Sequence, residues 1–111
     1  MITIIKQTDN NIKVNFKEDG EVFDITDYTV LFTVKSECRL NQEDDKAVIT
    51  KDITDHTDPA QGETAIILSN TETNISSGKY YFDLRLVKDG VITQTTRDEL
   101  EVVEGITKRT D

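Results

Sequence analysis

Apolar and polar residues alternate one by one along much of this 111-residue chain. The clearest segments are 28–35 and 80–87, where every second residue is apolar. A period of two residues is that of a β-strand, whose successive side chains point to opposite sides of a sheet. No window shows apolar residues at i, i+3, i+4 and i+7 over three helical turns. The pattern therefore predicts an all-β protein.

Turn-forming residues divide the chain into about seven such strands. Asp89 and Gly90 predict a tight hairpin, because both residues adopt the positive φ of a type I′ turn. Segment 69–78 predicts a crossover with one helical turn, pinned by Ile75. This spacing is typical of a β-sandwich or a β-barrel, and seven strands with one crossover suit an antiparallel Greek key. Its predicted core residues are Val14, Phe16, Val30, Phe32, Val34, Ile49, Ile66, Leu68, Tyr80, Phe82, Leu84 and Val102.

The length predicts one domain over residues 1–104, followed by a flexible tail at 105–111. The chain has 22 acidic and 13 basic residues, a formal net charge of -9. Such a charge repels phosphate backbones and anionic bilayers, so we expect neither nucleic acid nor a membrane as partner. No apolar run approaches the roughly 18 residues of a membrane span, and the first residues lack the features of a secretion signal.

Segment 51–69 contains His56, the only histidine of the chain, and Pro59, the only proline. A hydrolase could use such a histidine with a neighbouring carboxylate, from Asp55 or Asp58. The turn interpretation explains more residues. Pro59 presets φ for a turn, Asp58 can accept a hydrogen bond from the turn backbone, and Gly62 permits the conformation that restarts a strand. We therefore expect His56 to be a solvated turn residue.

The remaining chemistry-bearing residues give no recognised constellation. Cys38 is the only cysteine, and we expect a free thiol. The fixed ligand alternation of a calcium-binding EF-hand loop is missing, so we expect a solvated acidic surface, no metal and no cofactor. The acids considered for a calcium site are Glu43, Asp44, Asp45, Asp52, Asp55 and Asp58.

Candidate partner contacts lie on a strand and in a loop. Alternation turns Tyr80 and Phe82 to the core and Tyr81 outward, where it either packs across strands or anchors a partner. The charged loop 36–46 lies between two strands, and loops often carry contacts. The candidate contact residues are Tyr81, Arg39, Leu40 and Glu43.

Three stretches, read in order, resemble a known family: "FKEDGEVFDITDYTVLFTVKS", the segment "AVITKDITDHTDPAQGETAIILSNTETNISSGKYYFDLRLVKDG" and the closing "LEVVEG". Their marks are a "DG-x-x-x-D-I-T" entry to a long strand, a "DP-x-x-G" turn and a "G-K-Y-Y-F-D-L" strand closed by a DG hairpin. They resemble the immunoglobulin-like domains of tailed-bacteriophage structural proteins, typified by the N-terminal domain of baseplate upper proteins. The resemblance spans most of the chain, and the family offers no catalytic residues to carry over.

The resemblance implies an antiparallel immunoglobulin-like β-sandwich of about seven strands. It also implies a non-enzymatic component of a phage particle, in the tail, baseplate or head, that contacts other phage structural proteins. It also implies several copies per virion, made in the cytoplasm of the host bacterium. A host-surface or glycan-binding module is the alternative, because the same fold serves both roles. A hydrolase using His56 is the third and least supported hypothesis.

Overall fold

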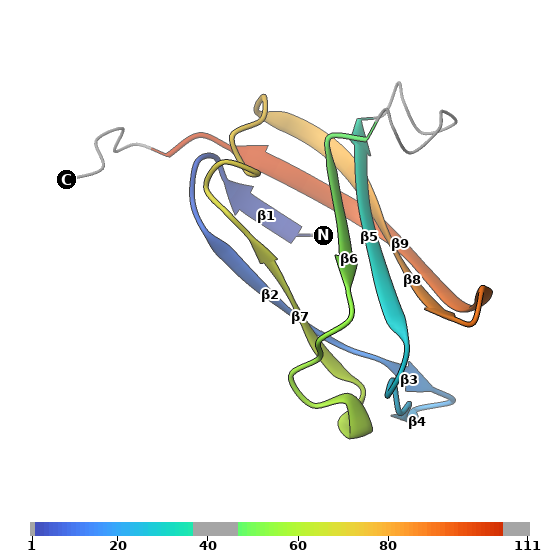
Figure 1. Ribbon diagram of the computed structural model, residues 1–111. Helices are drawn as coiled ribbons and strands as arrows, with labels where there is room; N and C mark the ends of the chain where they lie inside the picture. The colour runs from blue at the N-terminus through green and yellow to red at the C-terminus, as the bar shows by residue number, and fades with distance from the viewer. Residues whose placement is uncertain (1, 37–46, 106–111) are drawn as a thin grey trace.

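A computed structural model describes residues 2–36 and 47–105. In these ranges the chain forms strands and one short 3-10 helix, and Figure 1 shows their arrangement. The elements are β1 (Ile2–Ile5), β2 (Asn10–Asn15), β3 (Lys17–Glu18), β4 (Glu21–Val22), β5 (Thr29–Ser36), β6 (Ile49–Ile53), η3 (Pro59–Gln61), β7 (Glu63–Leu68), β8 (Gly78–Lys88) and β9 (Val91–Val103). The prediction of an all-β protein is confirmed.

The largest sheet has five strands in the order β1, β9, β8, β5, β6. Its pairs are antiparallel except for β1 and β9, which run parallel with Ile4 opposite Val102. The expectation of purely antiparallel strands is therefore wrong. The chain leaves β1 for the other layer before it returns, so β1 does not form a hairpin with its pairing partner. Alternation along one strand does not encode the direction of a neighbour distant in sequence.

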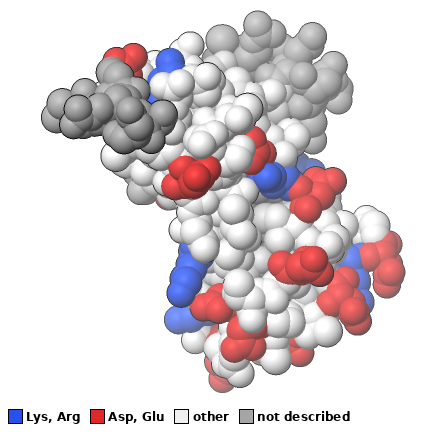
Figure 2. All heavy atoms as spheres, turned by 60° about the vertical axis from the view of Figure 1, so that its left-hand side comes forward, with Lys and Arg blue, Asp and Glu red and all other residues white. Residues whose placement is uncertain are grey.

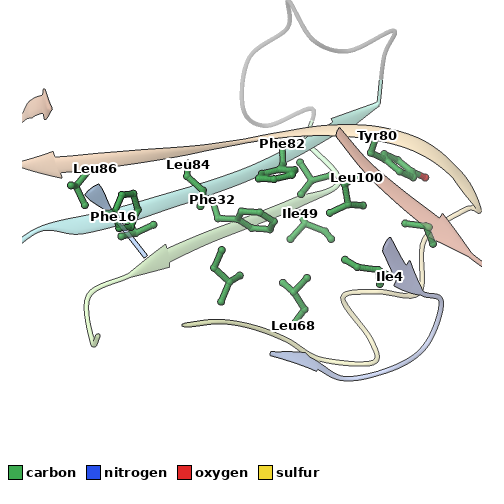
Figure 3. Packing of buried hydrophobic residues seen from close by; sticks show 14 of the residues in the cluster. Ile4, Phe16, Phe32, Ile49, Leu68, Tyr80, Phe82, Leu84, Leu86 and Leu100 are labelled. Carbon is green, nitrogen blue, oxygen red and sulfur yellow. The ribbon is translucent and has the colours of Figure 1, made fainter. Parts of the chain in front are cut away.

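A second layer consists of β2 and β7, which pair antiparallel with Ile12 opposite Ile66. Buried side chains fill the space between this pair and the five-stranded sheet (Figure 3). The short strands β3 and β4 form a separate hairpin. Nine strands thus occur in the described ranges, where about seven were predicted. The two-residue strands β3 and β4 are too short to show an alternating pattern.

The core agrees closely with the predicted one. Every predicted core residue is buried except Val14, which is partly buried and packs against the cluster. The rings of Phe32 and Phe82 lie with their centroids 5.6 Å apart. The core also contains four residues absent from the predicted set: Ile4, Ile25, Leu86 and Leu100. Ile25 lies between polar neighbours outside any strand, so no periodic pattern marks it.

The connections follow local chemistry. Asp89 and Gly90 both have positive φ between β8 and β9, which confirms the predicted hairpin. In the crossover after β7, the N–H of Ser69 donates to the Glu72 carboxylate, and the N–H of Glu72 donates to the Ser69 hydroxyl. This is the reciprocal pairing of a capping box. Ile75 packs against the core, as expected of the residue that pins this segment.

Candidate functional site

In the connection between β6 and β7, Pro59 is the first residue of η3. The backbone carbonyl of Asp58, and not its side chain, accepts a hydrogen bond from the N–H of Gln61. Gly62 then has a φ of 72°, and a Cβ there would lie 2.6 Å from the carbonyl oxygens of Phe16 and Phe23. Only glycine fits this position, so the turn interpretation of the segment accounts for its Pro and Gly residues.

His56 is not a solvated turn residue, and that expectation is wrong. Its ring is partly buried, with Nε2 2.7 Å from the carbonyl oxygen of Tyr28 and Nδ1 2.9 Å from the hydroxyl of Thr64. A carbonyl only accepts hydrogen bonds, so Nε2 carries a proton and donates it. Tyr28 precedes β5 and Thr64 lies in β7, so the imidazole joins the two layers. Thr64 is fully buried, which keeps its hydroxyl away from any substrate.

A different site lies on the outer face of the five-stranded sheet, opposite the core. Strand register places outward side chains of β5, β8 and β9 in three rows across the sheet. The middle row begins with the short side chains of Thr33 and Asp83, while longer side chains stand on both sides. The rows are Lys35 with Tyr81 and Glu99, Thr33 with Asp83 and Arg97, and Leu31 with Arg85 and Thr95. This difference in length hollows out a pocket of about 200 Å³, which we call the outer-face pocket.

Two cations lie near the aromatic ring of Tyr81, which lines this pocket. The Lys79 ammonium lies 5.8 Å and the Arg97 guanidinium 5.6 Å from the ring centroid of Tyr81. Both distances are in the range of cation–π attraction. Lys79 also pairs with Glu99 at 3.1 Å, and Nε of Arg85 lies 3.7 Å from Asp83. Within the described part of the chain, Arg97 has no carboxylate within salt-bridge distance, although its backbone pairs directly with Asp83.

The outer-face pocket contrasts with the charge of the whole chain. Three cations line it, Lys35, Arg85 and Arg97, against one acid, Asp83, on a protein of formal charge -9. Figure 2 shows one side of the molecule, where acidic groups are spread widely and basic groups lie among them. Cations therefore outnumber acids among the residues that line the pocket, in contrast to the chain as a whole.

The sequence prediction located one residue of this pocket. Tyr81 lies there, partly exposed, whereas Arg39, Leu40 and Glu43 lie outside the described residues. Alternation alone already turned Asp83 and Arg85 to the same face as Tyr81, so these two could have been named. Arg97 could not, because Leu86 pairs with Gln94 while Val87 pairs with Ile92. Thr93 is thus an extra residue in β9, and the bulge shifts the register in a way that no local pattern announces.

Other site types have less support. In the ranges 2–36 and 47–105, no three His, Cys, Asp or Glu side chains gather closely enough to hold a metal ion. Cys38 and the acids Glu43 to Asp45 of the calcium hypothesis lie outside these ranges. Nor does the described chain contain a helix long and apolar enough to cross a membrane.

No family model matches the chain, and no curated protein matches it. Any function therefore has to be argued from the fold, the outer-face pocket and the sequence pattern.

Proposed function

We propose that this protein is a non-enzymatic structural component of a tailed-phage particle, acting through protein–protein contacts of its outer sheet face. The observation that most directly supports such a contact is the set of residues that line the outer-face pocket. Tyr and Arg are among the residue types most enriched in the energetic centres of protein interfaces, and here Tyr81 lies with Arg85 and Arg97. The phage context comes from the sequence resemblance.

The finer fold that we propose is an immunoglobulin-like sandwich. That fold places strands C, F and G in one sheet and strands B and E in the other. Here β5, β8 and β9 are neighbours in one sheet, and β2 pairs with β7 in the other. Strand β6 beside β5 corresponds to the C′ strand of variable-type domains. This order supports the assignment, although the second layer has only two strands in the described ranges.

A hydrolytic role for His56 is the weaker hypothesis. A general base needs a free nitrogen directed at a reachable nucleophile. Both nitrogens of His56 have partners within the fold, and the hydroxyl that one of them meets is fully buried. These contacts are those of a residue that holds two layers together.

The proposal is tested on purified particles of the phage whose genome carries the gene. We expect the protein in several copies per particle by quantitative mass spectrometry. Phage with Tyr81→Ala and Arg97→Ala should incorporate less of it, and Lys13→Glu, on the exposed side of β2, serves as the surface control. Particles that never contain the protein would contradict the proposal.

A glycan-binding module remains a second candidate, because a partly exposed tyrosine beside a carboxylate and guanidinium groups also suits a sugar. The cations already placed against the Tyr81 ring make it a less open stacking platform. A glycan array distinguishes the two. Binding that is lost in Asp83→Ala would favour this candidate, and no signal on bacterial cell-wall sugars would remove it.

A further inference from the structure

The β3–β4 hairpin is an acidic projection of the fold. Its two-residue turn, Asp19 and Gly20, has positive φ at both positions, and every residue from 17 to 22 is exposed. At its base the N–H of Phe23 donates to the carbonyl of Phe16, and both phenylalanines pack on the core. Figure 1 shows the hairpin at the end of the molecule where β5 begins. The tip is thus anchored at its base and free at its end.

Two acids face each other on this hairpin. Glu18 pairs directly with Glu21 across the strands. Like charges in directly opposite positions destabilise an antiparallel pair. Within the described residues neither carboxylate has a cation within salt-bridge distance. The fold therefore keeps a local repulsion that a cation from another molecule would relieve.

The outer-face pocket supplies the complementary charge. Arg97 has no carboxylate partner in the described chain, and its guanidinium, attracted to the ring of Tyr81, has donors with which to bind a carboxylate. The outer-face pocket has a volume of about 200 Å³, which suits one or two side chains and not a whole strand. The pocket thus has the size and charge that an acidic hairpin tip requires.

We infer that the outer-face pocket binds the β3–β4 tip of a second copy of this chain, with Glu18 and Glu21 contacting Arg97 and Arg85. The inference rests on the proposed function, because it names one of the contacts made in the particle. The two surfaces differ, so the contact is heterologous. Each copy offers one tip and one pocket, and repetition generates a ring or an open chain.

The net charge sets the conditions for this contact. Copies of a chain with charge -9 repel one another at long range. At about 0.15 M ionic strength the Debye length is about 8 Å, so charges in direct contact outweigh those farther apart. The interface is small, which places it among weak contacts that require high concentration. In a particle, neighbouring attachment sites provide that concentration.

The first experiment is sedimentation equilibrium of the full chain up to about 1 mM, a concentration suited to weak association. We expect a mass that grows beyond the dimer with concentration and falls when salt is raised. A monomer throughout, or association that salt does not weaken, overturns the inference.

Variants then locate the contact. Arg97→Glu, and separately Glu18→Lys with Glu21→Lys, should each weaken self-association by about tenfold or more. Lys13→Glu changes the net charge by as much as Arg97→Glu and should associate like the wild type. All altered side chains are exposed, and equal melting temperatures check that the variants fold.

Mixing the two impaired proteins gives the sharpest result. The Arg97→Glu protein retains its acidic tip and the hairpin variant retains its basic pocket, so the mixture should associate although neither protein does so alone. The altered pocket and the altered tip are also of opposite charge, so the complexes can grow beyond one-to-one pairs. Failure of the mixture to pair overturns the inference. A protein that is monomeric in solution but present in particles would defeat this inference alone, whereas a self-associating protein absent from particles would defeat the proposed function alone.

Discussion

The two faces of the five-stranded sheet are built from the same strands but differ in chemistry, because one packs in the core and the other is exposed. Tyr80 faces inward, and its hydroxyl donates to the Ser76 carbonyl at 2.6 Å. Tyr81, the next residue, faces outward among Lys79, Arg97 and the outer-face pocket. The inner face derives its stability from apolar area removed from water, whereas the charges of the outer face remain in contact with water. Inner-face changes should therefore act on stability, and outer-face changes on association.

The largest expected effect comes from the inner face. Phe32→Ala and Phe82→Ala should each lower the free energy of unfolding by about 3 to 5 kcal/mol, because a cavity remains in a packed core. Tyr81→Ala, on the outer face, should cost about 1 kcal/mol or less. Urea unfolding followed by circular dichroism measures all three. Equal losses at Phe32 and Tyr81 would erase the distinction between the faces.

The second-largest difference in stability is expected between alanine substitutions at two glycines, one in the interior and one on the surface. Gly62 and Gly20 both have positive φ, but a Cβ meets two carbonyl oxygens at Gly62 and open space at Gly20. Gly20→Ala should cost about 1 kcal/mol through backbone strain alone. Gly62→Ala should exceed that loss by about 2 kcal/mol or more, since a buried backbone must also move. Equal melting temperatures for the two variants would mean that the backbone around Gly62 can shift at little cost in free energy.

The third-largest loss of stability is expected on removal of the His56 side chain, which joins the two layers. His56→Ala leaves the buried Thr64 hydroxyl and the Tyr28 carbonyl without a partner, which should cost about 1 to 3 kcal/mol. Thr64→Val removes the same contact from the other side. In a double-mutant cycle, the two losses should be smaller together than their sum. Strict additivity would mean that the imidazole and the hydroxyl do not interact.

The adjacent tyrosines provide a finer test. Tyr80→Phe removes the hydrogen bond to Ser76 and should cost about 0.5 to 1.5 kcal/mol, whereas Tyr81→Phe should leave stability nearly unchanged. Burial raises the pKa of Tyr80. Tyr80 therefore contributes to folding stability below the unfolded-state pKa of its hydroxyl, and this stability is lost as pH rises through the higher folded-state pKa. Alkaline unfolding of the wild type and of Tyr80→Phe would reveal that difference.

The smallest effect is expected at the partly exposed Glu72. Burial acts to raise the pKa of this carboxyl, but hydrogen bonds from Ser69 and the ion pair with Lys51 outweigh it and lower the pKa from its ordinary 4.5. The resulting stability is complete above pH 4.5 and is lost as pH falls through the lower folded-state value. Glu72→Gln should cost about 0.5 kcal/mol or less at neutral pH and nothing in strong acid. A loss that persists at low pH would assign the effect to packing.

Much of the fold was accessible from the sequence, because its signals are local. Alternation assigned the inward residues of β5, β7 and β8, and the pair Asp89 and Gly90 marked its hairpin correctly. The prediction was wrong where an interaction joins distant segments, as in the parallel pairing of β1 with β9. It also treated His56 as a solvated residue, because the partners of that ring are 28 and 8 residues away in the sequence.

The sequence by itself determined which side of each long strand is apolar and where the chain turns, since both follow from the geometry of successive residues. Only the tertiary structure decided which strands are neighbours and in what register. That register brings Thr33, Asp83 and Arg97 into one row across three strands, and so creates the pocket. The physical reason is that pairing energy depends on contacts between segments far apart in the chain, which no local periodicity records.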